Sequence, residues 1–195
     1  MDLGISTVKM FPWVGKSYND AGYRGRKLLI LGESEYEWHP EALQPEIATW
    51  LITANANGGL RNPFYTKIYN SFSDEPKRQS LEHFAEFWNS VAFYNYIQEK
   101  VGTTPRQRPT WEMWPRWRDT FLLVLEKLKP NRVLVLGRAL WNNLNALGLI
   151  GNGMNNEAFF SIGDGKSIKV AHIPHPASFG FKPSEWKKIT LTLLS

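Results

Sequence analysis

Three short runs with the pattern of a strand recur along the chain, two of them mostly apolar, and each ends at a small or polar cluster. They lie at residues 27–31, 132–136 and 167–172, and the first two are followed directly by Gly32 and Gly137. An apolar run of this length that stops at a glycine predicts a buried strand. Ligands of open α/β sheets bind at the carboxyl ends of the strands. We therefore expect the polar residues after these runs to meet at one rim of a sheet.

Apolar residues at helical spacing occupy the intervals between these runs. The pattern predicts helices at residues 40–54, 63–72, 80–88, 111–129 and 139–147, a last helix that begins at Pro183, and a further strand at 91–97. No repeat or linker divides the chain. We expect a single domain over residues 1–195, with a three-layer α/β/α fold around a central, mainly parallel four-stranded sheet. Residues 1–26 show no clear period and receive no assignment.

Composition narrows the class of protein. The chain has 195 residues, of which 43% are hydrophobic, and this length suffices to bury a sizeable core. No run of 18 apolar residues and no basic region followed by an apolar stretch occurs, so we expect a cytoplasmic monomer without a membrane partner. The absence of cysteine excludes disulfides, zinc thiolate sites and cysteine-ligated iron–sulfur clusters.

Positive charge is concentrated in one aromatic segment. The net charge is +5, and between residues 100 and 118 five cations accompany the single acid Glu112. Such a mixture suits phosphates and unstacked bases, so Arg106, Arg108 and Trp111 are candidates for contact with DNA. Trp114 and Trp117 have helical spacing with later apolar residues, which favours a place in the core.

Four polar or aromatic segments follow one another in a recognisable order. They are Gly32-Glu33-Ser34-Glu35-Tyr36, Asn62-Pro63-Phe64-Tyr65, Val91-Ala92-Phe93-Tyr94-Asn95 and His175-Pro176-Ala177-Ser178. Together they resemble the motifs of the uracil-DNA glycosylase superfamily, and the resemblance covers nearly the whole chain. It implies a monofunctional glycosylase that flips a pyrimidine out of DNA and hydrolyses its N-glycosidic bond, leaving an abasic site. No cofactor and no metal are implied.

The resemblance implies roles for three residues in binding and activating the base. His175 matches the histidine that donates to the base O2 oxygen as negative charge develops there. Asn95 matches the asparagine that bonds the polar edge of the pyrimidine, and Phe64 matches the aromatic ring on which the base stacks. As single residues, these three could equally be a strand-end histidine, a satisfied amide and a core ring.

The first of these segments departs from the family pattern. An aspartate that orients water is usual at the position of Ser34, and it is missing here. Glu33 or Glu35 could supply the carboxylate, and we favour Glu33, with Ser34 beside it. Tyr36 matches the tyrosine that packs near C5 of the pyrimidine and excludes larger bases.

The last segment continues through residues that suit contact with DNA. Phe179 or Phe181 could intercalate and fill the gap left by a flipped nucleotide, whereas Ser178 and Lys182 could hold phosphates. Alternatively, these aromatic residues pack a loop against the sheet.

Other functions remain open. Gly32-Glu33-Ser34 also resembles the start of small serine esterases, with Ser34 as nucleophile and His175 as base, although His172 stands where that family has its acid. His172 and His175 could bind a metal, but no third ligand is evident. A nucleic-acid-binding protein that kept the fold and lost catalysis is the main alternative.

The resemblance leaves open which base would be excised. Uracil and a modified cytosine are both candidates, the second because some related glycosylases remove hypermodified bases, including glucosylated ones, from phage DNA in bacterial defence. Without a lysine at a nucleophile position, we expect no strand cutting.

Overall fold

A computed structural model of the protein describes residues 1–35, 45–74, 80–102, 107–151, 157–162 and 166–195. Its sheet has six strands in the order β1-β3-β2-β4-β6-β5. The four inner strands are β3 (Ala92–Asn95), β2 (Leu28–Gly32), β4 (Arg132–Leu136) and β6 (Lys166–Ile173), and they run parallel to one another. The predicted strands therefore form the centre of the sheet.

The prediction of a four-stranded sheet was wrong, because the sheet is mixed and has an additional antiparallel strand at each edge. Strand β1 (Trp13–Val14) pairs with β3, and β5 (Glu157–Ile162) pairs with β6. The first of these comes from the N-terminal segment to which the sequence pattern assigned no element. Two paired residues are too few to produce a detectable alternation.

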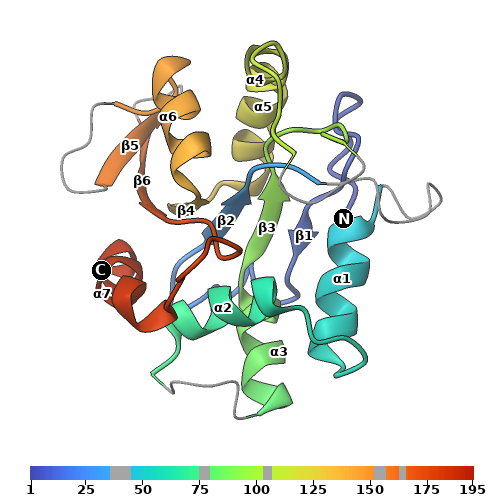
Figure 1. Cartoon of the computed structure of the whole chain (residues 1–195), viewed down its shortest axis with the longest axis vertical. Coiled ribbons are helices and arrows are strands. Elements are labelled where there is room, and N and C mark those ends of the chain that lie inside the picture. Colours follow the sequence, from blue (N-terminus) through green and yellow to red (C-terminus); the bar gives the residue numbers. More distant parts are fainter. Residues whose placement is uncertain (36–44, 75–79, 103–106, 152–156, 163–165) are drawn as a thin grey trace.

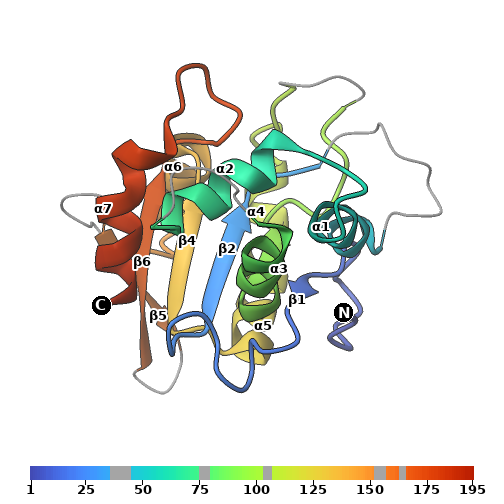
Figure 2. The same ribbon diagram turned by 90° about the horizontal axis from the view of Figure 1, so that it is seen from below.

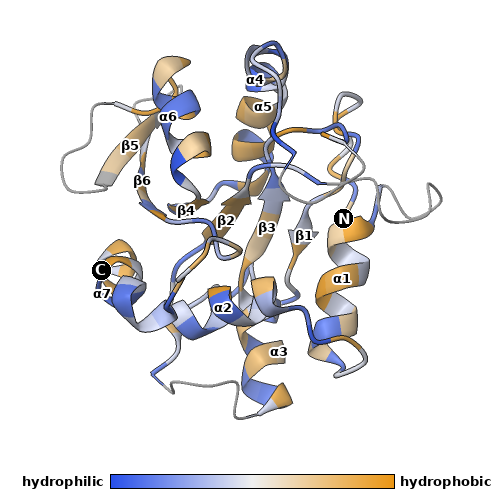
Figure 3. Cartoon of the chain, in the orientation of Figure 1, coloured by the Kyte–Doolittle hydropathy of each residue, from blue (hydrophilic) through white to orange (hydrophobic). Residues whose placement is uncertain are grey.

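Helices cover both faces of the sheet (Figures 1 and 2). One face carries α1 (Ile47–Ala56), α2 (Pro63–Phe72), α3 (Leu81–Ser90) and α7 (Pro183–Leu194), and the other carries α4 (Met113–Arg116), α5 (Arg118–Leu128) and α6 (Arg138–Ala146). Side chains alternate across a strand, so Leu28 and Ile30 pack on the first layer while Leu29 and Leu31 pack on the second. The strands β2 and β4 are accordingly almost wholly apolar (Figure 3), whereas β6 also contains Ser167, Lys169 and His172.

Most predicted helices match observed ones to within a few residues. The predicted helix 40–54 overlaps α1, although residues 40–44 lie outside the described ranges. The predicted helix 111–129 is instead two helices, α4 and α5, interrupted at Trp117. The carbonyl of Trp114 accepts a hydrogen bond from the hydroxyl of the core residue Tyr96 at 2.8 Å. In a continuous helix, this carbonyl would instead accept from the backbone amide four residues later. None of the helices in the described ranges has the length and hydropathy needed to cross a membrane.

Candidate active site

The candidate site lies at the carboxyl ends of β2, β3 and β6, on the rim predicted from the sequence pattern (Figure 1). In the parallel register of β2 and β3, Gly32 stands opposite Asn95. Glu33 follows Gly32 directly, and His175 comes two residues after the end of β6. Three strands thus bring an acid, an amide and an imidazole to one edge.

Gly32 and Asn95 are in close contact. A Cβ atom on Gly32 would lie 2.2 Å from the Oδ1 atom of Asn95, so only glycine leaves room for this amide. Asn95 is buried, and its Nδ2 atom donates to Oε2 of Glu35 over 3.5 Å. Its backbone carbonyl accepts from Nε2 of Gln98 at 2.6 Å. Asn95, the residue predicted to bind the base, is therefore fixed by hydrogen bonds through both its side chain and its backbone.

Phe64 lies in the first turn of α2, next to the histidine. Asn62 caps this helix by accepting from the Phe64 amide at 2.9 Å, and Pro63 occupies the first helical position, where no amide proton is needed. The Phe64 ring is half-buried, with its centroid 5.3 Å from that of His175 and 6.2 Å from that of Phe93. The helix start thus brings an aromatic face to the edge of the sheet.

The protonation state of His175 follows from its surroundings. Its Nδ1 atom accepts from the backbone amide of Ala177 at 3.2 Å, so the proton of the neutral ring is on Nε2. Burial, together with the positive charges of Arg108 and Lys67, lowers the pKa of His175 to about 4. His175 is therefore a neutral hydrogen-bond donor at physiological pH.

Glu33 is paired with Arg108. The Nη1 atom of Arg108 lies 2.8 Å and 3.1 Å from the two carboxylate oxygens of Glu33. The glutamate side chain is only 8% exposed, whereas that of Arg108 is 66% exposed. One guanidinium group therefore spans from solvent to a buried acid and also acts on His175.

The loop between β6 and α7 carries the last predicted segment and extends away from both elements (Figure 2). Phe179 is fully exposed at 105%, and Gly180 after it has a positive φ of 72°. Phe181 is half-buried: its ring stacks on that of Trp186 and lies 5.7 Å from Nζ of Lys67. Of the two aromatic candidates for intercalation, Phe179 is therefore the accessible one.

The other candidate residues differ in their exposure to solvent. Ser34 is half-buried, and Ser178 and Lys182 are exposed, with Lys182 paired to Glu185 at 3.4 Å. Trp111 is 77% exposed, whereas Trp114 and Trp117 are buried, as predicted. Tyr36 and Arg106 lie outside the described residues.

His172 does not face the same side of the sheet as His175. Its ring stacks on Trp141 of α6 with a centroid distance of 4.6 Å, and burial lowers its pKa. Among the residues that the structure describes, no group of three or more potential metal ligands occurs.

Three residues contribute to the site in ways that the sequence pattern did not predict. Arg108 was assigned to DNA, yet it bonds Glu33; Glu35 was only an alternative acid, yet it bonds Asn95. Lys67, which we did not select, donates to the Pro176 carbonyl at 2.8 Å and supports the histidine loop. The signal in the sequence was its position about one turn after Pro63, where the helix begins.

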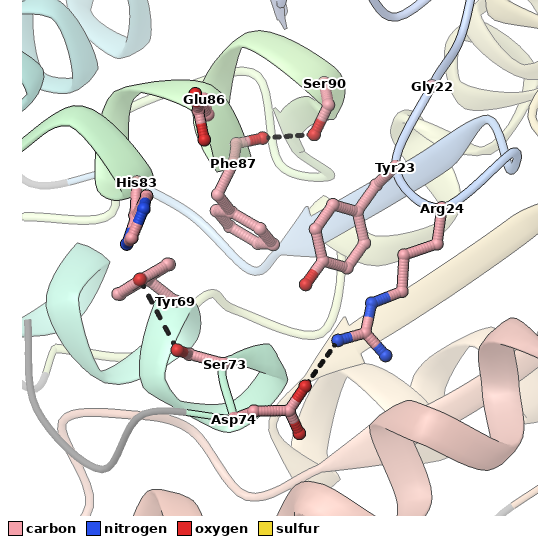
Figure 4. Close-up of a pocket in the computed structure, with 10 residues that line it drawn as sticks. All are labelled: Gly22, Tyr23, Arg24, Tyr69, Ser73, Asp74, His83, Glu86, Phe87 and Ser90. Carbon is pink, nitrogen blue, oxygen red and sulfur yellow. Dashed lines mark hydrogen bonds and ion pairs between the residues drawn. The ribbon is translucent and has the colours of Figure 1, made fainter.

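A cavity of about 410 Å³ opens elsewhere, between α2, α3 and the turn before β2 (Figure 4). Its wall includes Tyr23, Tyr69 and Phe87, and the ion pair of Arg24 with Asp74 lies at its mouth. Among the predicted site residues that the structure describes, none lines it. The candidate site at the carboxyl ends of the strands and this cavity are therefore separate.

Comparison with known proteins does not indicate a family for this chain. Neither the models of known protein families nor the curated proteins contain a match to this chain.

Proposed function

We propose that the chain is a monofunctional DNA glycosylase that flips out a pyrimidine and hydrolyses its N-glycosidic bond, leaving an abasic site. The observation that carries this proposal is His175: a neutral ring with its Nε2 proton available, packed beside the Phe64 face. A stacking surface and a hydrogen-bond donor for one edge of a base are thereby adjacent. The bond cleavage requires no metal or cofactor.

The chemistry of the reaction matches a neutral donor. Breaking an N-glycosidic bond leaves positive charge on the sugar and negative charge on the departing base. In the proposed reaction, the Nε2 proton of His175 bonds the O2 oxygen of the base as its charge grows. The nearby cations Arg108 and Lys67, which lower the pKa of His175, would also favour that anion.

Base recognition and water alignment would use the remaining residues. The base would stack on Phe64, and its polar edge would face the amide of Asn95. Glu33 would orient the attacking water, with Arg108 holding its carboxylate in place. Because carboxylate oxygens accept several hydrogen bonds, pairing with Arg108 leaves capacity for a water.

Contact with DNA would involve the exposed residues near the rim. Phe179 would intercalate where the nucleotide leaves the stack, and Trp111 could stack on an unpaired base. Ser178 and Lys182 would contact phosphates. The net charge of +5 agrees with a polyanionic partner.

The leading alternative is a binding protein that keeps this fold without catalysis. It is favoured by the ion pair of Glu33, because a carboxylate already bonded at both oxygens by Arg108 is a weaker acceptor for water. An esterase is less well supported. Its histidine would need an acid at Nδ1, and in His175 that atom accepts from the amide of Ala177.

Release of free base tests the proposal. The purified protein is incubated with DNA containing uracil and, separately, with phage DNA containing modified cytosines, and freed bases are identified by mass spectrometry. We expect one base to be released, and His175→Ala and Asn95→Ala to abolish release. His83→Gln, which changes an exposed histidine on α3, serves as the control and should keep full activity.

The outcomes separate the candidates. Loss of release in both site variants, with an intact control, supports a glycosylase and identifies its substrate as uracil, for a role in repair, or a modified cytosine, for a role in defence against phage. DNA binding without release of any base would reject catalysis and favour the binding protein.

A further inference from the structure

Glu35 lies beside the amide with which the proposed site would recognise a base. Its Oε2 atom accepts from Nδ2 of Asn95 over 3.5 Å, across 60 positions of sequence. The residue is half-buried and lies three positions after β2, where its backbone forms an isolated parallel β-bridge with that of Lys100. A carboxylate at this place adds a strong acceptor next to Asn95.

The orientation of the Asn95 amide is set by its two neighbours. The nitrogen faces the carboxylate of Glu35, and Oδ1 lies against the Cα atom of Gly32, where an added Cβ would come within 2.2 Å. Turning the amide over would place Oδ1 against the carboxylate, which is unfavourable because both are acceptors. Asn95 therefore presents its nitrogen on the side of Glu35.

Glu35 is also close to the aromatic platform. Tyr65 follows Phe64 in α2, and the two rings meet edge to face with centroids 5.2 Å apart. Burial raises the pKa of Tyr65 strongly, and the negative charge of Glu35 raises it further, so the carboxylate acts on this ring. The Phe64 ring also meets that of Phe93, two residues before Asn95 on β3, with centroids 6.2 Å apart. A base stacked on Phe64 would therefore have Asn95 and its partner Glu35 along one edge.

Pyrimidines differ at that edge in a way that a carboxylate can distinguish. Uracil has an O4 acceptor beside an N3–H donor, whereas cytosine has an N4 amino donor beside an N3 acceptor. A carboxylate accepts from the amino group of cytosine, and an amide nitrogen donates to its N3. Against uracil, the carboxylate of Glu35 and O4 would be two facing acceptors.

We propose that Glu35 is a specificity-determining residue, which accepts from the exocyclic amino group of the base while Asn95 donates to N3. The substrate is then a cytosine-type base, with or without a substituent at C5, in preference to uracil. This inference rests on the proposed function and selects between the substrates left open there. It assigns to Glu35 the recognition of the base and leaves water alignment to Glu33.

The test compares bases within one sequence context. Single-stranded oligonucleotides, chosen so that base pairing does not contribute, contain one uracil, cytosine, 5-methylcytosine or 5-hydroxymethylcytosine at the same position. Free base and abasic sites are measured for the wild-type protein, Glu35→Gln, Glu35→Asp and the control Glu126→Gln, an exposed acid on α5. Matched folding of the variants is checked by circular dichroism.

The expected result is a change in preference rather than a general loss. The wild-type protein should favour one or more cytosine-type bases over uracil, and Glu35→Gln should shift that ratio toward uracil by about tenfold, since glutamine also carries an amide donor. Glu35→Asp, which keeps the acceptor, should retain the preference at a lower rate. Glu126→Gln should match the wild-type protein.

Two results would overturn the inference, and they differ from failure of the proposed function. Release of uracil in preference to every cytosine-type base would leave the glycosylase intact and reject the role of Glu35. An unchanged ratio in Glu35→Gln would do the same. If no base is released at all, the affinity of the His175→Ala protein for the same oligonucleotides is measured in place of the rate of base release. Equal affinity for oligonucleotides with uracil and with cytosine-type bases would then reject the inference.

Discussion

The neutral state of His175 makes the stability of the fold depend on pH. Burial and two nearby cations lower the pKa of this histidine to about 4 in the folded chain, against an ordinary value near 6.5. The folded state therefore disfavours the protonated ring. The stabilisation linked to His175 is complete above pH 6.5 and is lost progressively as the pH falls toward 4.

The size of the effect follows from the two pKa values. At pH 5 the unfolded chain binds a proton at this residue almost completely, whereas the folded chain mostly does not. Linkage gives a loss of about 2 kcal/mol in the free energy of unfolding between pH 7.5 and pH 5 from His175 alone. His172, whose pKa burial also lowers, adds a loss of the same sign.

Urea denaturation at both pH values measures this contribution. The asparagine variant His175→Asn removes the titrating group, so its stability should fall by about 2 kcal/mol less than that of the wild-type protein over the same interval. The exposed-histidine variant His83→Gln should behave like the wild-type protein. Equal pH dependence in the wild-type protein and His175→Asn would refute the burial and charge argument for this residue.

Three further predictions concern the neighbours of the site. Gly32→Ala should displace the Asn95 amide, because the new Cβ would lie 2.2 Å from Oδ1; the free energy of unfolding should fall by about 1–2 kcal/mol and base release should be lost, whereas Gly151→Ala, in open space, should change neither. Arg108→Ala should raise the pKa of His175 in an NMR titration, because it removes a positive charge that lowers this pKa, and Arg116→Ala, which breaks the pair with Glu99, should not. Phe179→Ala should leave the free energy of unfolding within about 0.5 kcal/mol of the wild-type value yet weaken DNA binding in a fluorescence assay, and Phe159→Ala, at an exposed position of the edge strand β5, should not weaken it.

Periodicity along the chain was sufficient to locate the inner strands and most helices. The runs at residues 27–31, 132–136 and 167–172 became β2, β4 and β6. The first two are apolar at nearly every position because those strands are buried on both faces, whereas β6 mixes buried apolar residues with more exposed polar ones. The exposed Trp111 and the buried Trp114 and Trp117 also followed from local spacing. These features depend on neighbours within a few residues.

The edges of the sheet could not be obtained in the same way. β1 has only two residues and is defined by its pairing with β3, roughly eighty positions later in the chain. Next to the interruption between α4 and α5, the carbonyl of Trp114 accepts a hydrogen bond from Tyr96, which directly follows β3 and is distant in the sequence. A local pattern contains no information about such partners.

The candidate site shows the same division. By itself the sequence determined which polar residues stand at the carboxyl ends of the strands, including Glu33, Asn95 and His175, because strand ends follow from local hydrophobicity. Only the tertiary structure decided that Glu33 pairs with Arg108, 75 positions away, and that Asn95 faces Glu35, 60 positions away. Those pairings depend on distances and side-chain directions between separate loops, which are set by how the strands and helices pack against one another.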